Sequence, residues 1–225
     1  MSLLQALWTF QGEIRTGEQL AAEAWRIELD ILGKPMGIQD AYFSALGGVR
    51  QLTFGPQSEL GVNWRSLDLA PDRVNQLSNS LLLFYTHRTR KSSSILERQV
   101  RNIPDRLRVL DELRDLALEG TRCLETAEFE RFGRLLPEGW VLKTQMADGI
   151  TDKAIDDIYE AALEAGATGG KIAGAGGGGF LLLYCPLSAQ DRVRARLNGT
   201  LREVPFHFDH DGSRIVFNVR RDPYF

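Results

Sequence analysis

A run of glycines in the last third of the chain constrains the fold more than any other feature. Residues 169–185 read GGKIAGAGGGGFLLLYC, so the glycines stand directly before an apolar segment. Glycine loses more conformational entropy on folding than any other residue, so such a cluster calls for positive φ angles or a close backbone approach. The segment FLLLYC predicts a buried strand and is too short to span a membrane. With the helical spacing before it, the expected order is helix, short strand (171–173), glycine turn and buried strand.

This order excludes the common nucleotide-binding loops. Gly174, Gly176 and Gly179 fit the G-x-G-x-x-G spacing, but a dinucleotide site needs a helix after the glycines, whereas here a strand follows. A P-loop ends in Gly-Lys-Ser/Thr and a protein kinase carries HRD and DFG motifs, and the sequence has none of these. Two interpretations remain: a turn whose bare backbone touches a ligand or another loop, or a tight turn packed on a neighbouring element.

Composition places the chain among ordinary globular proteins. It has 225 residues, 43% of them hydrophobic and 25% charged, with a net charge of −3. This size allows one large domain or two small ones, and the slightly acidic balance gives no support for nucleic-acid binding. Cys123 and Cys185 lie outside any C-x-x-C pattern and are expected to be reduced core thiols. With no recognisable signal peptide, we expect a cytoplasmic protein that binds neither nucleic acid nor a membrane.

Helices and strand-like runs alternate in the first third of the chain. Residues 2–10 are apolar almost from the start and predict a helix that is entered in mid-course. A capping box at Thr16 opens a second helix, which is expected to stop at Gly33. Two alternating runs, 49–54 and 62–69, predict antiparallel strands.

A second buried strand is predicted over residues 81–86, and it ends in the basic, hydroxyl-rich sequence HRTRKSSS. Arg88, Arg90 and Lys91 can hold an anion there together with serine hydroxyls. The other interpretation is a solvated turn that caps the next helix, SSILERQV, and the residues alone do not choose between the two.

The following part of the chain is mostly helical, and the C-terminus predicts a hairpin. Two short helices are expected over 126–136 and 137–146. An Asp-Gly turn in DHDG predicts a hairpin between LREVPFHF and SRIVFNV. This order of elements predicts an α+β layer sandwich with domains over residues 1–78 and 79–225.

Asp40 is the candidate for acid–base chemistry in the first domain. It follows Gly37 in the segment GIQD, at the start of the short helix AYFSAL. An acid in this place commonly only caps the helix by accepting backbone N–H bonds. It can equally be held beside a substrate hydroxyl, oriented by Gln39 and neighbouring amides.

The sequence H-x-D-H-D near the C-terminus invites a metal interpretation. His207 alternates with phenylalanines, whereas His210 and Asp211 lie in the predicted turn. Because these side chains need not converge, we expect no metal site built by them.

Two motifs give the chain a family resemblance. GIQDAYFSALGG and KIAGAGGGGFLLLYCP resemble the catalytic-aspartate segment and the third motif of the GHMP small-molecule kinases, in the same order. LLLFYTHRTRKSSSILERQ and PFHFDHDGSRIVF further resemble the bacterial D-glycero-D-manno-heptose 7-phosphate kinases. The resemblance implies a remnant of a ribosomal-protein-S5-like N-terminal domain followed by a GHMP-kinase C-terminal α/β sandwich, which is ferredoxin-like.

The resemblance also implies roles for the candidate residues. Asp40 matches the aspartate that orients or deprotonates the sugar hydroxyl attacking the γ-phosphate of ATP, with Mg²⁺ as the accompanying cation, and Gly37 and Gln39 lie on its substrate side. The acceptor in this branch is the anomeric hydroxyl of a sugar or sugar phosphate, whose phosphate is a fitting partner for the basic residues after the second strand. The third-motif glycines would line the active site and support the phosphate loop: Gly174, Gly176, Gly177, Gly178 and Gly179.

One departure from the family pattern has consequences for function. The phosphate loop of the family, Pro-x-Gly-x-Gly-Ser-Ser, is expected before the helix over 2–10, and the sequence contains no such segment. We therefore expect a family member without its N-terminal part, whose unpaired strand edges offer a surface for a homodimer. Three hypotheses follow: a truncated ATP-dependent sugar kinase, an inactive remnant or sugar-binding module, and a half-enzyme completed by another chain.

Overall fold

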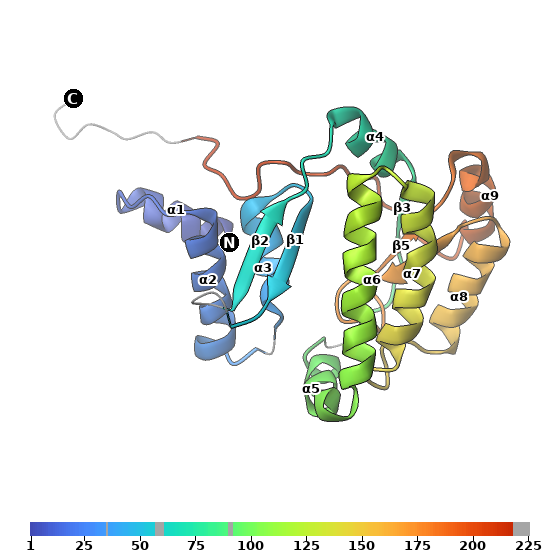
Figure 1. The fold of residues 1–225 in the computed structure, drawn as a ribbon, viewed down its shortest axis with the longest axis horizontal. Helices are drawn as coiled ribbons and strands as arrows, with labels where there is room; N and C mark the ends of the chain where they lie inside the picture. Colours follow the sequence, from blue (N-terminus) through green and yellow to red (C-terminus); the bar gives the residue numbers. More distant parts are fainter. Residues whose placement is uncertain (35, 57–60, 90–91, 218–225) are drawn as a thin grey trace. The chain divides into compact units, whose positions relative to one another are not determined.

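The computed structural model describes residues 1–34, 36–56, 61–89 and 92–217 (Figure 1). The chain divides into two compact units, residues 1–66 with 208–225, and residues 67–207. Helices and antiparallel strands occur in both, as the α+β prediction requires. Among the described helices, none is long and apolar enough to cross a membrane.

The first unit consists of helices and a two-stranded hairpin. Its elements in chain order are α1 (Ser2–Phe10), α2 (Gly17–Arg26), the π-helical turn η1 (Ile27–Ile31), α3 (Ile38–Leu46), β1 (Arg50–Phe54) and β2 (Val62–Ser66). The capping box is confirmed, since the Thr16 hydroxyl accepts the N–H of Gln19 at 3.2 Å and the Gln19 side chain accepts the N–H of Thr16 at 3.0 Å.

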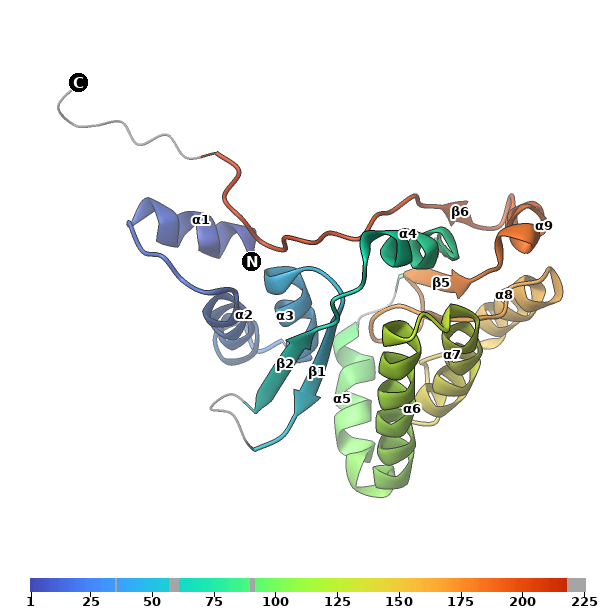
Figure 2. The same ribbon diagram turned by 45° about the horizontal axis from the view of Figure 1, so that its top comes forward.

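The core of the first unit lies where α2 and α3 run side by side against the hairpin (Figure 2). Its buried members are aliphatic side chains and one tyrosine: Leu20, Ala21, Ala41, Tyr42, Ala45 and Val62. The hairpin register pairs Leu52 with Trp64, and the Arg50 guanidinium lies 4.6 Å from the centre of the Trp64 ring.

The segment after β6 does not form the predicted hairpin. Residues 213–217 are not a strand, and the turn that was expected to join two strands instead rests on the end of α3. The N–H of Gly48 donates to the carbonyl of Asp209 at 2.7 Å, and the N–H of Ser213 donates to the carbonyl of Ala45 at 3.2 Å. The prediction was wrong because these backbone groups find their partners in a helix terminus that local sequence does not reveal.

The second unit is a four-stranded antiparallel sheet with helices. Its elements are α4 (Pro71–Asn79), β3 (Leu81–Tyr85), α5 (Ser92–Asn102), the 3₁₀ turn η2 (Ile103–Asp105), α6 (Leu107–Glu125), α7 (Phe129–Thr144), α8 (Lys153–Glu164), β4 (Gly169–Ile172), β5 (Phe180–Tyr184), α9 (Leu187–Leu197) and β6 (Arg202–Glu203). The strand order is β4-β5-β3-β6. Leu181 and Leu183 of β5 are buried in the core, as predicted for FLLLYC.

The first compact unit ends at residue 66 in this part of the chain, and the predicted domain boundary of 78/79 falls in the last turn of α4. Val74 and Leu77 of α4 are buried, and the helix leads directly into β3, so the division falls at residue 66. Residues 208–217 belong to the first unit because they bond to the end of α3.

A single helix, α7, replaces the two short helices predicted on either side of Pro137. Proline lacks the N–H that an interior helical position donates, so a break was expected there. In the structure the proline ring packs on β4: a Cβ on Gly169 would lie 2.4 Å from Cδ of Pro137. The proline therefore lies on the side of α7 that faces the sheet.

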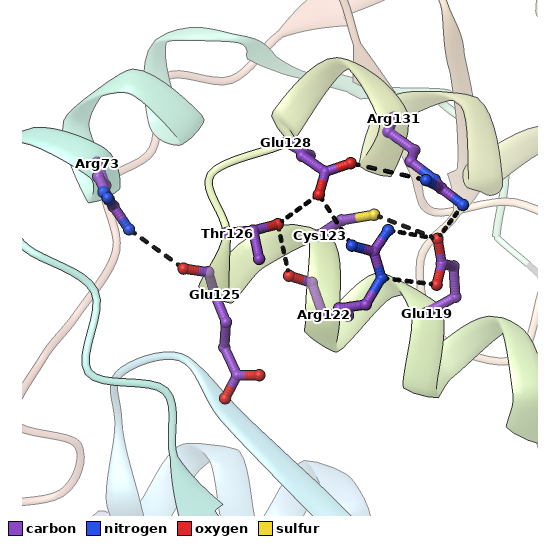
Figure 3. Close-up of polar contacts among 8 residues, drawn as sticks. All are labelled: Arg73, Glu119, Arg122, Cys123, Glu125, Thr126, Glu128 and Arg131. Atoms are coloured by element: carbon purple, nitrogen blue, oxygen red, sulfur yellow. Dashed lines mark hydrogen bonds and ion pairs between the residues drawn. The ribbon is translucent and has the colours of Figure 1, made fainter.

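The connection between α6 and α7 is held by a cluster of charged side chains (Figure 3). Arg122 donates to Glu119 and Glu128, each at 2.9 Å. Arg131 lies 2.6 Å from Glu119 and 3.7 Å from Glu128, so the two cations and two anions alternate around a ring. The hydrogen bond from Arg122 is the main cause of the lowered pKa of Glu119.

Candidate functional site

The glycine loop, residues 173–179, joins β4 to β5. The predicted setting of strand, turn and strand is therefore confirmed, and it is not the setting of a dinucleotide site or a P-loop. The predicted glycines all have positive φ angles: 74° at Gly174, 101° at Gly176, 75° at Gly177, 144° at Gly178 and 87° at Gly179. Other residues rarely adopt such angles, which explains why glycines gather here.

The second half of the loop is tightly packed on two other segments. The N–H of Gly177 donates to the carbonyl of Ile150 at 2.7 Å, and the N–H of Gly179 donates to the carbonyl of Arg88 at 2.8 Å. A Cβ on Gly178 would lie 2.6 Å from that same Arg88 oxygen. In this half of the loop, the glycine backbone therefore lies directly against two other loop segments.

The first half of the loop is open. Gly174 is exposed, and no atom lies within 4 Å of the place where its Cβ would stand. The ammonium group of Lys143, at the end of α7, donates to the carbonyl of Gly174, and the Gln99 amide of α5 reaches the carbonyl of Ala175 at 3.4 Å. Bare backbone beside a cation is the part of the loop that a phosphate group can approach.

The carbonyl of Gly179 accepts two hydrogen bonds from Thr86, the residue that follows β3. The backbone N–H and the hydroxyl of Thr86 each donate to it at 2.9 Å. Thr86 is one of few buried polar residues in the described part of the chain. This double contact fixes the point where the loop enters β5.

The basic segment after β3 is only partly described. Arg90 and Lys91 lie outside the described residues. Arg88 is described, and its guanidinium donates to Asp152 at the start of α8. Its predicted role as a contact for a substrate phosphate therefore competes with an ion pair that already exists in the structure.

Sequence reasoning missed Asp152, Lys143 and Gln99 as neighbours of the glycine loop. Asp152 stands directly before α8, where an aspartate commonly caps a helix, and its Oδ1 accepts the N–H of Ile155 at 3.1 Å. The contacts that these residues make to the loop or to Arg88 join positions 31 to 76 residues apart. No local spacing signals such contacts.

Asp40 lies in the first turn of α3, in the first unit. The N-cap residue of this helix is Gly37. Glycine has no side chain, so the helix has no side-chain capping hydrogen bond at this position. Asp40 and Gln39 are exposed. Within the described part of the chain, the Asp40 side chain makes no hydrogen bond or ion pair, so the capping interaction that was the alternative to a catalytic role is not present there.

The first aspartate of the H-x-D-H-D sequence accepts hydrogen bonds from the backbone of its own turn. The Asp209 carboxylate accepts the N–H groups of Asp211 and Gly212 at 2.9 and 2.8 Å, and these bonds lower the pKa of Asp209. Across the described residues, no group of three or more His, Cys, Asp or Glu side chains is placed to hold a metal ion.

Comparison with known proteins identifies the second unit. Residues 122–203 match the family model described as GHMP kinases C terminal. This segment of the chain is therefore similar to the C-terminal domain of GHMP kinases. The glycine loop lies inside the matched GHMP region, together with α7, α8 and α9.

Curated relatives of this GHMP-domain chain are small-molecule kinases. It is 27% identical over 168 residues to the D-glycero-alpha-D-manno-heptose 7-phosphate kinase of Campylobacter jejuni, which covers 74% of this chain and 49% of the relative. It is 28% identical over 213 residues to the mevalonate kinase of Methanothermobacter thermautotrophicus, which covers 94% of this chain and 66% of the relative. The chain thus spans about half to two thirds of the length of these relatives.

A solved structure shares the fold. The crystal structure of a D-glycero-D-manno-heptose 1-phosphate kinase from Bacteroides thetaiotaomicron superposes with a TM-score of 0.67 at 23% identity, over 93% of this chain and 58% of that one. The expected GHMP-kinase fold is confirmed by this match and by the family model.

Proposed function

We propose that the chain is part of an ATP-dependent sugar kinase that transfers the γ-phosphate of ATP to the anomeric hydroxyl of a sugar or sugar phosphate. A heptose 7-phosphate is the first acceptor to test, because a heptose 7-phosphate kinase is among the curated relatives. The observation that carries the proposal is the glycine loop inside the GHMP domain, with an open first half beside Lys143. Phosphoryl transfer depends mainly on positioning and charge neutralisation, which such a loop assists.

Asp40 is the proposed catalytic residue. It is exposed at the start of α3 and is not used as a capping group within the described part of the chain. A carboxylate in this state is available to orient or deprotonate an attacking hydroxyl. Asp40 and the glycine loop belong to different compact units, and substrate binding is assigned to Gly37 and Gln39 beside Asp40.

The described residues fit part of an ATP site. The backbone at Gly174 and the ammonium of Lys143, which donates to the Gly174 carbonyl, would face phosphate oxygens. Among the residues that the structure describes, no group of three or more His, Cys, Asp or Glu side chains is placed to hold Mg²⁺. A cation bound with the nucleotide would neutralise phosphate charge.

The family's Pro-x-Gly-x-Gly-Ser-Ser loop is not among the 225 residues. We therefore propose that turnover requires a segment carrying this loop, supplied by a longer form of the same protein or by another chain. The same reasoning leaves open a sugar-binding module without catalysis, which keeps the acceptor site and binds no nucleotide.

Calorimetric titration of the 225-residue chain separates these alternatives. ATP and the heptose phosphate are titrated individually, with buffer as the blank. Binding of ATP tighter than about 1 mM, or about −4 kcal/mol, together with transfer of radiolabelled phosphate to the sugar, supports a kinase that acts alone. Sugar binding without ATP binding supports the binding module or the half-enzyme.

Complementation then decides between those two. A polypeptide that carries the phosphate loop of a heptose kinase is added to the chain, and transfer of radiolabelled phosphate is measured. Transfer that depends on both components supports the half-enzyme. If neither the chain alone nor the mixture transfers phosphate to any sugar or sugar phosphate, the proposed kinase function is wrong.

A further inference from the structure

Arg88 contacts the glycine loop and its surroundings through two different groups. Its backbone carbonyl accepts the N–H of Gly179 at 2.8 Å. Its guanidinium donates from Nη2 to Oδ2 of Asp152, while Oδ1 of the same carboxylate caps α8 by accepting the N–H of Ile155 at 3.1 Å. One residue therefore ties the loop to the start of a helix.

A second backbone hydrogen bond of the glycine loop closes these contacts into a ring. The N–H of Gly177 donates to the carbonyl of Ile150 at 2.7 Å, and Ile150 stands two residues before Asp152. The ring passes from Arg88 to Gly179, along the loop to Gly177, across to Ile150, and through Asp152 back to Arg88. Side chains at Gly176 and Gly178 would be blocked, because a Cβ there would lie 2.7 Å from the Ile150 carbonyl and 2.6 Å from the Arg88 carbonyl.

The environment of the ion pair favours a fixed contact over an exchangeable one. The side chains of Arg88 and Asp152 are 35% and 25% exposed, so the pair is partly withdrawn from solvent and screened less than a surface pair. A phosphate group could capture the guanidinium only by breaking this contact and leaving the Asp152 carboxylate without one of its donors, which costs free energy.

We propose that Arg88 is a positioning residue that holds the glycine loop in its conformation, and that it does not contact the substrate phosphate. The inference rests on the proposed function for its catalytic meaning, but its structural content can be tested without turnover. The substitution Arg88→Gln removes the ion pair and leaves the backbone carbonyl in place. Asp152→Asn removes the charge and keeps an oxygen that can cap α8.

Amide hydrogen exchange of the glycines measures the effect directly. The chain is labelled with ¹⁵N-glycine, and exchange is followed by NMR for Gly177 and Gly179 in the ring. Gly170 is the internal reference, because its N–H donates to the Tyr159 hydroxyl at 3.1 Å in the same sheet, outside the ring. Lys153→Gln is the control variant, since Lys153 follows Asp152 in sequence and pairs with Asp157 on the helix surface.

Arg88→Gln and Asp152→Asn are each expected to speed exchange at Gly177 and Gly179 by about fivefold, as for loss of a partly exposed charged hydrogen bond. Exchange at Gly170, and all three rates in Lys153→Gln, should stay at the wild-type value. Unchanged rates at Gly177 and Gly179 in both ring variants would overturn the proposal. So would an equal rise at Gly170, because the pair would then stabilise the whole sheet and not the loop.

Kinetics provide the functional readout where phosphoryl transfer is observed, with the chain alone or complemented. As a positioning residue, Arg88 should affect kcat equally for phosphorylated and unphosphorylated acceptors, and Arg88→Lys should restore part of it. A rise in KM confined to phosphorylated acceptors would show that Arg88 binds the substrate phosphate, and would overturn the proposal. Failure to observe transfer at all bears on the proposed function and leaves the exchange result standing.

Discussion

Gly47 and Gly212, far apart in the sequence, cross with their backbones in direct contact. A Cβ on Gly47 would lie 2.3 Å from the nitrogen of Gly212, and a Cβ on Gly212 would lie 2.5 Å from the carbonyl oxygen of Ala45. Both glycines also have left-handed φ angles, 60° and 65°. The crossing fastens the turn after Asp209 to the end of α3, so it explains why a sequence that resembles a hairpin turn forms no hairpin.

Alanine at position 212 should destabilise the first unit, because the new methyl group must displace backbone and adopt a left-handed conformation. We expect Gly212→Ala to lower the free energy of unfolding by about 2–4 kcal/mol. Gly33→Ala is the matched control: its φ angle is 61°, but nothing lies within 4 Å of its Cβ position, so only the conformational cost of about 1 kcal/mol applies. Urea unfolding followed by tryptophan fluorescence measures both. Equal losses would show that the crossing is not tightly packed.

A second glycine contact joins α7 to the sheet. A Cβ on Gly133 would lie 2.4 Å from the Tyr184 ring, so Gly133→Ala is expected to cost about 2–3 kcal/mol by overpacking. Gly139, on the same helix, meets only a leucine methyl group at 4.0 Å. Gly139→Ala should therefore stabilise the chain by up to about 1 kcal/mol through helix propensity. Thermal unfolding by circular dichroism should show Tm shifts of opposite sign, and a parallel shift would refute the packing argument.

Local sequence patterns predicted the elements whose structure is determined by residues within the element itself. The capping box at Thr16, the strand FLLLYC and the glycine turn between two strands all follow from residue type and spacing. The helix through Pro137 and the missing C-terminal hairpin could not be predicted, because each is decided by packing on a distant element.

In the candidate site, too, local features could be predicted from the sequence and tertiary contacts could not. The glycines were found from their density, and the positive φ angles confirm why they are needed. Arg88 was recognised as a cation, but its partner Asp152 stands 64 residues away. Whether a cation faces a ligand or a carboxylate of its own chain is a question of tertiary structure, and sequence chemistry alone does not answer it.

Buried thiols should make stability fall at alkaline pH. Burial raises the pKa of the Cys185 thiol to about 11, above the ordinary value of about 8.5–9 in an unfolded chain. The unfolded state then loses its proton first, so stability is complete below pH about 9 and declines as pH rises through about 11. The loss due to Cys185 is on the order of 2 kcal/mol.

Comparison with Cys185→Ala isolates this contribution, because burial also raises the pKa of Tyr159 and Tyr184 and both tyrosines remain in the variant. Urea unfolding at intervals from pH 7 to pH 11 should give a flatter decline for Cys185→Ala than for the wild type. The cavity left by the substitution lowers the whole curve without changing its slope. Identical slopes would mean that the thiol ionises as easily in the folded chain as in the unfolded one.

Asp40→Asn should separate catalysis from helix stability. The substitution keeps the shape of an exposed side chain in the first turn of α3, so the free energy of unfolding should change by less than about 0.5 kcal/mol. If Asp40 orients or deprotonates the sugar hydroxyl, kcat should fall by about 10²–10⁴-fold. Asp72→Asn is the matched control, since Asp72 is likewise an exposed acid in the first turn of a helix, α4. Phosphoryl transfer is measured with the chain alone or complemented, whichever shows turnover. If Asp40→Asn and Asp72→Asn have the same kcat, Asp40 has no catalytic role. Its carboxylate then only interacts favourably with the positive end of the helix dipole.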